Sequence, residues 1–436
     1  MKSDFFPTFG QLLSMSRKER ILIFLLAALN FTHILDFMIM MPLSNYLMPY
    51  FSISPHQFSL LVGAYSLSAV FSGILLSSMV DKHDRKKVLL IVYIGFLLGT
   101  LACGFADSYK LLMAARLTAG FFGGIIGGQV FSIISDTFSY ERRGMAVGSV
   151  MAAFAIASIV GVPVALYLTN RFHYNWHVPF LLVGGLASLL IPLIIMILPS
   201  LKDHINENDD AKYRFQALIK VIKNPSQGMA LIFTMLMMMG HFLIIPFINP
   251  YMEFNKGYTK AQIPMVYLVG GIASLLSAIY LGRVSDNLGK FKVFTFSVLS
   301  SLIMVIGITN MPVIPFSLVL VFFAIWFVFA TGRGVTAQAM VTNVVEKEQQ
   351  GSFMVLNSSM QHAGTFLASI ISGYIVIETK TGKIERYEWV GYLSIVVLLG
   401  CFLIGRYLFR HMDKKVPQEI ISGDMKEPQR IVASQE

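Results

Sequence analysis

The chain has 436 residues, of which 55% are apolar and 13% are charged, about half the charged fraction of a typical soluble domain. The charged residues are segregated and leave apolar runs of about 20 residues, the length that crosses the core of a bilayer. The formal net charge of +10 is spread over the short segments between these runs. This pattern argues against a soluble domain and a nucleic-acid partner, and it indicates an all-α integral membrane protein.

Twelve apolar runs predict twelve transmembrane helices. In chain order they cover residues 21–48, 56–80, 87–105, 109–136, 143–169, 177–199, 227–249, 259–282, 291–309, 313–342, 349–377 and 388–410. Ser54 and Pro55 supply a helix cap and a first-turn proline for the second run. The first run is too long for a cleavable signal peptide, and no small-residue cleavage site follows it.

Four prolines and a glycine repeat lie inside the runs. Pro42, Pro163, Pro192 and Pro246 are expected to bend their helices. Gly120, Gly124 and Gly128 recur at four-residue spacing in the fourth run, which favours close helix packing over a glycine-lined substrate path.

A charged cassette occurs twice, each time between two apolar runs. Residues 77–87 read Ser-Ser-Met-Val-Asp-Lys-His-Asp-Arg-Lys-Lys, and residues 282–292 read Gly-Arg-Val-Ser-Asp-Asn-Leu-Gly-Lys-Phe-Lys. Internal duplication is frequent in secondary transporters. We therefore predict two six-helix bundles at residues 1–200 and 227–411, joined by a cytoplasmic linker at 201–226 and followed by a cytoplasmic tail at 412–436.

The linker has two interpretations. Phe215, Leu218, Ile219 and Ile222 recur at helical spacing with lysines opposite, which favours a short amphipathic helix in the membrane interface. A solvated linker is the alternative. The tail from Met412 onward is polar and is expected to be disordered.

The basic residues predict the orientation. With the N-terminus in the cytoplasm, 25 of the 34 lysine and arginine residues lie on the cytoplasmic side and 7 on the other, while Arg116 and Arg333 lie within spans. This bias follows the positive-inside rule, and it predicts cytoplasmic termini in a plasma (inner) membrane protein.

Several kinds of chemistry lack support in the sequence. Cys103 and Cys401 both fall inside spans and are expected to be free and buried. Residues 331–334 lack the Gly-Lys-Ser/Thr ending of a Walker A loop, and neither paired cysteines nor clustered histidines with metal-ligand spacing occur. We expect no enzyme activity, cofactor or bound metal.

The cassettes and several further motifs resemble those of the major facilitator superfamily. Asp81, Arg85 and Lys86 match its motif A, although Ser77 and Asp84 replace glycines. Gly289 keeps the second of these glycines in the other cassette, where Asp286 and Lys290 hold the acidic and basic positions.

Motifs in the other spans place the resemblance in one branch of the superfamily. Arg116 and Gly120 resemble motif B. Gly161 and Pro163 resemble the antiporter motif C, with one residue inserted between them. With residues 35–42 and 351–361, the chain resembles the arabinose-efflux-permease-like branch of the drug:proton antiporters. The resemblance implies two six-helix bundles around a central cavity, worked by alternating access.

Asp36 and Arg116 are the leading candidates for proton coupling, because a charge deep in a bilayer is costly and is read as functional. Counting 1.5 Å per residue places both, and His241, at a similar depth of about 20 Å from the inner face. His241 lies 205 residues after Asp36, the spacing of the two cassettes, and His33 lies one turn inward of Asp36. The resemblance ties Arg116 to proton coupling.

Structural roles remain open for each of these residues. Asp36 and Arg116 can form a permanent structural pair, Arg116 can tie helices through backbone carbonyls, and each histidine can be a hydrogen-bonded core residue. Arg333 lies near the inner end of its span and is interpreted as a gating or interface residue. The resemblance also implies that motif A acts as an inner gate, for which solvated turns at Asp81 and Asp286 are the alternative.

A substrate cavity is implied by the helices that line it in the superfamily. Polar, soft or small residues of spans 1, 4, 7 and 11 are its candidates: Asn30, Met40, Gly123, Met238, His241, Asn357 and Gln361.

The leading interpretation is a proton-coupled exporter of a small organic solute (drug-like, sugar or amphiphile), monomeric in the lipid bilayer. An importer or uniporter is the alternative within transport, and a non-transporting membrane receptor or scaffold is the alternative outside it.

Overall fold

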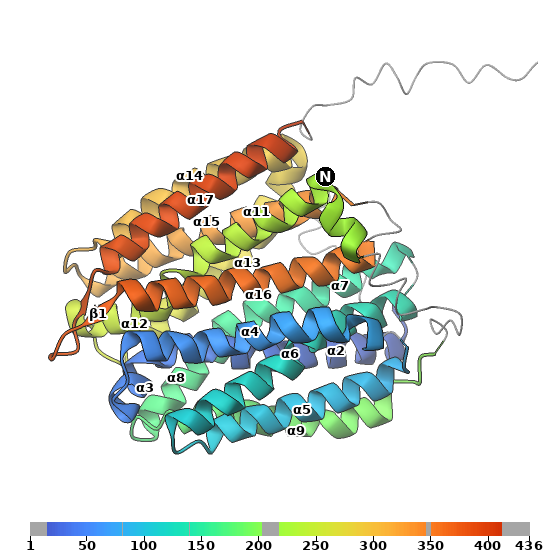
Figure 1. Ribbon diagram of the computed structural model, residues 1–436, viewed down its shortest axis with the longest axis horizontal. Helices are drawn as coiled ribbons and strands as arrows, with labels where there is room; N and C mark the ends of the chain where they lie inside the picture. Colours follow the sequence, from blue (N-terminus) through green and yellow to red (C-terminus); the bar gives the residue numbers. More distant parts are fainter. Residues whose placement is uncertain (1–14, 81, 139, 203–217, 346–349, 412–436) are drawn as a thin grey trace, which may run out of the picture.

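A computed structural model describes residues 15–80, 82–138, 140–202, 218–345 and 350–411 (Figure 1). The long helices lie roughly along one common direction. The start of α2 (Arg17–Ile39) and the end of α17 (Tyr387–Phe409) lie at one end of the bundle, here called the terminal end. The short hairpin of β1 (Ile377–Glu378) and β2 (Ile384–Glu385) lies at the opposite end, here called the hairpin end.

The two halves of the chain form two groups of helices, as the duplication predicts. After α2, the first half contains η1 (Met41–Leu43), α3 (Ser44–Phe51), α4 (Pro55–Val80), α5 (Arg85–Gly104), α6 (Tyr109–Thr137), α7 (Tyr140–Ile156), η2 (Ala157–Gly161), α8 (Val162–Arg171) and α9 (His177–Ile197). Before α17, the second half contains α11 (Pro225–Phe242), η3 (Ile245–Phe247), α12 (Ile248–Pro250), η4 (Tyr251–Asn255), α13 (Ile263–Leu288), α14 (Lys290–Thr309), α15 (Phe316–Thr342) and α16 (Gln350–Ile375).

Length and composition qualify eleven helical segments as membrane spans, counted over the described residues alone. The other long helix, α16, corresponds to the predicted eleventh span, and its polar residues, among them Asn357, Gln361 and His362, make it less apolar. The prediction of twelve transmembrane helices in two six-helix bundles is confirmed.

The helix ends follow local rules that the sequence carries. Ser54 and Gln57 exchange backbone-to-side-chain hydrogen bonds of 3.3 and 2.9 Å, so α4 begins at Pro55 with the expected cap. Pro42 and Pro246 lie in the 3₁₀ turns η1 and η3, where the first helix of each half is interrupted. Gly120 and Gly124 pack α6 against Tyr65 and Ala69 of α4, whereas Gly128 has no such neighbour.

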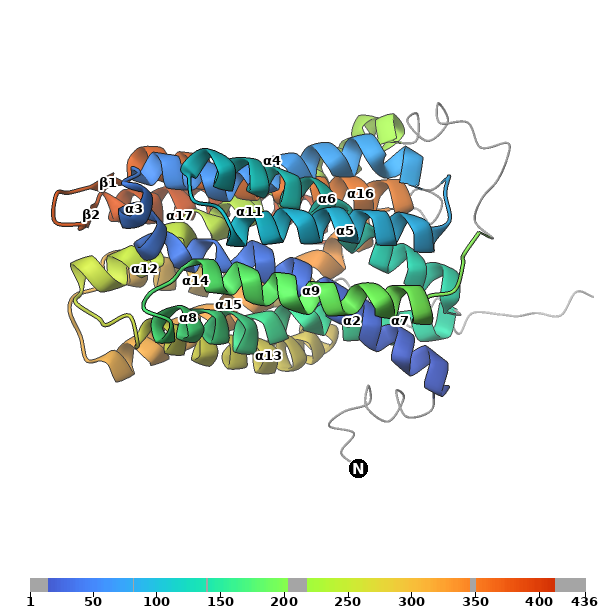
Figure 2. The same ribbon diagram turned by 90° about the horizontal axis from the view of Figure 1, so that it is seen from below.

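The halves meet along two lines. α4 packs along α16, and α13 packs along η2 and α8. Figure 2 shows α13 beside α8 from below. The approach of α13 is close because position 271 is glycine: a Cβ there would lie 2.8 Å from the backbone nitrogen of Ile159.

Polar contacts join the halves at the hairpin end. Asn249 donates a hydrogen bond of 2.7 Å to the carbonyl oxygen of Pro42, and Asn170 donates one of 3.0 Å to that of Lys260. Asn45 also donates to Glu253 across the junction. The Lys260 ammonium lies 3.8 Å from the Glu253 carboxylate and 4.6 Å from the centroid of the Tyr46 ring. This end of the bundle is therefore closed.

The linker falls largely outside the described residues. Residues 218–223 are helical, with Leu218 and Val221 buried and Ile222 exposed. The predicted contribution of Phe215 and the tail from residue 412 onward lie outside the described residues.

Candidate functional site

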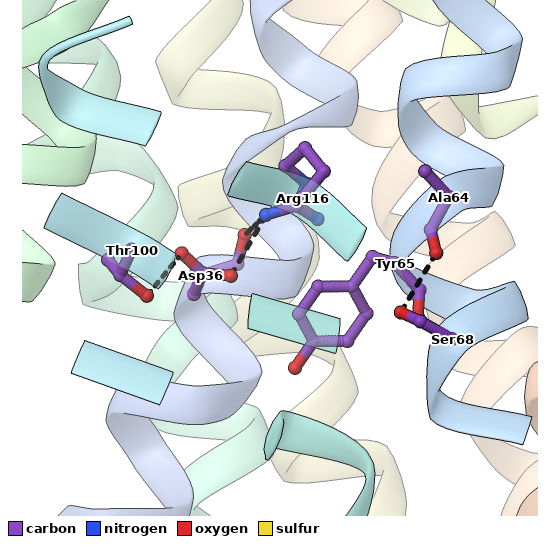
Figure 3. Close-up of polar contacts among 6 residues, drawn as sticks. All are labelled: Asp36, Ala64, Tyr65, Ser68, Thr100 and Arg116. Carbon is purple, nitrogen blue, oxygen red and sulfur yellow. Dashed lines mark hydrogen bonds and ion pairs between the residues drawn. The ribbon is translucent and has the colours of Figure 1, made fainter. Parts of the chain in front are cut away.

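A buried ion pair lies in the first half, where α2, α5 and α6 meet. Neither side chain is exposed, and Arg116 Nη1 lies 2.9 Å from Asp36 Oδ2 (Figure 3). The same nitrogen also donates to the backbone oxygen of Asp36 at 3.3 Å, and Thr100 Oγ1 donates to Asp36 Oδ1 at 3.0 Å. The equal depth predicted for Asp36 and Arg116 therefore corresponds to direct contact.

Tyr65 of α4 closes the other side of this pair. The Arg116 guanidinium lies 4.6 Å from the centroid of the Tyr65 ring, within the range of a cation–π interaction (Figure 3). Gly120 permits the approach, because a Cβ there would lie 2.6 Å from the Tyr65 Cα. The Tyr65 hydroxyl is buried without a hydrogen-bond partner among the described residues.

His33 lies beside the pair without bonding to it. Its ring is 6.3 Å from Tyr65 and 6.2 Å from Phe96, centroid to centroid, and neither ring nitrogen has a hydrogen-bond partner within the described part of the chain. Gly123 lies between Tyr65 and His33, since a Cβ there would be 3.2 Å from the His33 ring.

A second buried arginine site lies in the second half. Arg333 of α15 is 2% exposed; its Nη1 donates to Ser301 Oγ at 2.9 Å, and its Nη2 lies 2.9 Å from His241 Nδ1. Because a guanidinium only donates, Nδ1 of His241 must accept, so the imidazole is neutral with its proton on Nε2. The Trp326 ring stacks on His241 at 5.4 Å and 26°.

The position of Arg333 differs from the one predicted near the inner face. Its Cα does lie in the C-terminal half of α15. Side chains on a helix tilt toward its N-terminus, however, and α15 begins at the hairpin end. The long side chain therefore reaches α11 and α14, and Arg333 belongs to the interior of the second half.

Aromatic contacts connect the two sites across the halves. Phe37, next to Asp36, makes edge contacts with Phe242 at 5.8 Å and with His362 at 6.4 Å. Phe242 in turn adjoins His241 at 5.2 Å. Phe37 of the first half and Phe242 of the second half thus connect the surroundings of the two arginine sites. We call the rings of Phe37, Phe242 and Trp326 the aromatic layer.

The remaining cavity candidates have varied environments. Asn30 donates to the carbonyl oxygen of Val150 at 3.2 Å and ties α2 to α7, while Met40 is fully buried in the core. Met238 is partly buried. Asn357 is buried with Oδ1 unpartnered among the described residues, and Gln361 lies 3.5 Å from the Gln338 side chain. Their assignment to a substrate cavity stays a prediction.

The first charged cassette ties helices together at the terminal end, although Asp81 lies outside the described residues. Arg85 Nε lies 3.0 Å from Asp136 Oδ2 of α6, an acid that sequence reasoning missed. Lys86 Nζ donates to the carbonyl oxygen of Ile195 at 2.7 Å. These contacts join α5 to α6 and α9.

Asp84 caps α5 in the place of a family glycine. It accepts hydrogen bonds from the backbone nitrogen of Lys86 at 3.0 Å, from Ser200 Oγ at 2.6 Å and from the backbone nitrogen of Leu201 at 3.0 Å. Burial raises the pKa of this carboxyl, but the hydrogen bonds outweigh it and hold the pKa below its usual range.

The second cassette is built differently. Gly289 ends α13 with φ of +105°, a conformation that disfavours any residue with a Cβ. Asp286 is exposed, and Lys290 begins α14. The gating role of both cassettes stays a prediction.

The residue inserted into the motif C pattern coincides with a π-helical turn. Residues 157–161 form η2, and the backbone nitrogen of Val162 donates to the carbonyl oxygen of Ala157, five residues earlier. Gly161 ends this turn against Leu35, and Pro163 lies in the first turn of α8. A π turn holds one residue more than an α turn and is frequent at functional sites.

Cys103 and Cys401 are both buried and unbridged, as expected. Within the described ranges, histidine, cysteine and acidic residues form no group of three or more that could hold a metal ion.

Sequence comparisons identify relatives over most of the chain. The model of the major facilitator superfamily matches residues 26–337 and 230–432. An uncharacterised transporter of this type, YceJ of Bacillus subtilis, is 22% identical over 79% of this chain and 86% of its own length. The putative transporter AraJ of Escherichia coli is 21% identical over 53% of this chain and 57% of its own length. A probable sugar efflux transporter of Mannheimia succiniciproducens is 24% identical over 68% and 75%, respectively.

Solved structures share the fold. The nucleoside transporter NupG superposes with a TM-score of 0.71 at 15% identity, covering 89% of this chain and all of NupG. A D-xylose–proton symporter gives 0.70 at 14% identity, covering 87% of this chain and 96% of the symporter. The twelve-helix architecture and the family match agree: the chain belongs to the major facilitator superfamily and is a membrane transporter, not an enzyme.

Proposed function

We propose that this transporter exports a small organic solute in exchange for protons, with Asp36 as the proton site. The buried Asp36–Arg116 pair is the observation that carries the proposal. In the described part of the spans, Asp36 is the one fully buried carboxylate, and a charge at that depth needs a functional or structural reason. Among the similar proteins, the probable sugar efflux transporter agrees with export, and the D-xylose–proton symporter agrees with proton coupling but not with the direction.

Proton binding at Asp36 changes how three helices hold together. The Asp36 carboxylate accepts a hydrogen bond from Thr100 of α5 and forms an ion pair with Arg116 of α6. A proton on Oδ2 converts the pair into a neutral acid facing a cation, which weakens the attraction. α2 is then freer to move against α5 and α6, while Arg116 keeps its contact with the Tyr65 ring.

The closed hairpin end supports alternating access. With both termini in the cytoplasm, this end faces outward, and its opening requires release of the contacts of Asn249 with Pro42 and of Asn170 with Lys260. Protonation of Asp36 beneath this junction biases the balance between the two states only if the states differ in proton affinity.

The test is flux in proteoliposomes with simultaneous recording of internal pH, over a broad panel of solutes. We expect solute export coupled to proton entry in the parent protein, and flux without pH coupling in Asp36→Asn. The control is Asp107→Asn, which removes an exposed acid between α5 and α6. Flux that runs with the proton gradient identifies an importer, and coupled transport that persists unchanged in Asp36→Asn removes Asp36 from the mechanism.

The orientation has a separate test. We propose a monomer in the plasma (inner) membrane with both termini inside. A cysteine introduced at Asn208 should react only after the membrane is made permeable to the labelling reagent. Reaction with an impermeant reagent in intact cells contradicts this topology.

A further inference from the structure

Arg333 is a buried cation whose charge is not balanced by any residue that the structure describes. Its side chain is 2% exposed and its bonded neighbours are a hydroxyl, Ser301, and a neutral imidazole, His241. Within the described ranges, no aspartate or glutamate oxygen lies within 4 Å of its guanidinium. A buried charge without a counter-charge is costly inside a membrane bundle. A negatively charged ligand that binds beside Arg333 therefore does not have to compete with an acidic side chain of the protein for its attraction.

The position of this cation suits a transported ligand. His241 and Phe242 are only half-buried, and Phe242 contacts Phe37 of the other half, so the site borders the contact between the halves. The Trp326 ring stacks on His241, and its buried indole N–H has no hydrogen-bond partner among the described residues. One cation, one spare donor and aromatic surfaces therefore adjoin each other.

We propose that Arg333, with His241 and Trp326, binds the carboxylate of a small organic monoanion with an apolar body. The proposal rests on the proposed function and names the substrate class of that transporter. A carboxylate matches the planar donors of a guanidinium better than any other group of single charge. It replaces His241 as the acceptor of the Nη2 proton. One negative charge balances Arg333, whereas a dianion leaves one charge unpaired.

The apolar body is assigned to the aromatic layer. Trp326 and Phe242 adjoin His241, and Phe37 contacts Phe242; such rings pack well against an aromatic or aliphatic substrate. A neutral amide or an amine of the same shape keeps these contacts and loses the ion pair, so matched compounds isolate the charge.

The test is calorimetric titration of the purified protein at pH 7.5 with three matched sets. Each set has one body carrying a carboxylate, an amide or an amine: phenylacetate, phenylacetamide and phenethylamine; hexanoate, hexanamide and hexylamine; gluconate, gluconamide and glucamine. We expect an apolar carboxylate to bind at least about tenfold more tightly than its amide. The gluconate set is expected to bind weakly, because its body is polar.

Variants assign the preference to Arg333. Arg333→Gln should abolish it, Arg333→Lys should keep part of it, and the exposed Arg171→Gln should leave it unchanged. If Arg333→Gln does not fold, the parent protein and Arg333→Lys still decide the outcome. Equal binding of carboxylate and amide in all sets overturns the proposal, as does tighter binding of phenyl phosphate than of phenylacetate.

Failure of this inference and failure of the proposed function are distinguishable. Selective carboxylate binding without pH-coupled flux supports the anion site and contradicts proton coupling. Proton-coupled flux of neutral or cationic solutes, without carboxylate binding, supports the transporter mechanism and overturns the anion site.

Discussion

The two halves of the bundle each bury one arginine against their first helix, but the halves balance its charge differently. In the first half, Arg116 faces Asp36 at 2.9 Å. In the second half, Arg333 faces His241, which lies at the position that the duplication relates to Asp36. One scaffold used twice thus supplies one site that is neutral by itself and one that carries a charge. The difference suggests a division of labour, with proton binding in the first half and substrate binding in the second.

The largest expected effect comes from breaking the neutral site. Asp36→Asn leaves Arg116 buried without its counter-charge and should lower the free energy of unfolding by about 3–5 kcal/mol. Adding Arg116→Gln removes the orphan charge and should restore most of the loss, because buried pairs are often replaceable by neutral groups. Thermal unfolding in detergent measures both. A double variant less stable than the single one contradicts this account.

The sharpest test of the comparison is to give the second half the acid it lacks. His241→Asp should pair with Arg333 and neutralise it, so carboxylate binding should fall by at least about tenfold. His241→Gln keeps an acceptor without a charge and serves as the control. Unchanged carboxylate binding in His241→Asp shows that Arg333 is not the anion site.

Substitutions in the two cassettes should have smaller effects, each lowering the free energy of unfolding by about 1–2 kcal/mol. Asp84→Ala removes the cap of α5 and its bonds to residues 200–201, which should destabilise the protein by about 1 kcal/mol. Gly289→Ala forces a Cβ into φ of +105° and should cost about 1–2 kcal/mol. The reverse exchange, Asp84→Gly, should be milder than Asp84→Ala. Equal stability of all three variants contradicts these roles.

The effect of Asp84 should depend on pH. Its folded pKa lies below the ordinary value of 3.8, so its contribution is present above that value and is lost as the pH falls through the folded pKa. The stability difference between the parent and Asp84→Ala should therefore shrink in acid. A difference that grows in acid reverses the assigned sign.

Much of this arrangement could be predicted from the sequence, and the limits have a physical cause. The lengths of the apolar runs predicted the spans, and the repeated cassette predicted the two halves. Counting residues along the helices predicted that Asp36 and Arg116 lie at a similar depth. Counting gives height along a helix, however, and neither rotation about its axis nor the reach of a long side chain. For that reason Arg333 was not expected at His241.

Other parts of the site were missed for lack of a sequence signal. Thr100 and Tyr65 lie in apolar runs without any distinguishing pattern, and their roles arise from which faces of α4 and α5 turn toward α2. Asp136 lies fifty-one residues from Arg85 along the chain, and only the packing of α5 on α6 brings them together.

The π turn at residues 157–161 has a consequence for reading relatives of this chain. In a regular helix each added residue rotates everything beyond it by about 100°. A π turn holds one residue more than an α turn, so it takes up an inserted residue without rotating the helix beyond it. Gly271 packs against Ile159 within this turn. The changed spacing of Gly161 and Pro163 is thus a local widening of the helix. A protein of this family can gain or lose one residue here while both flanking helices keep their partners.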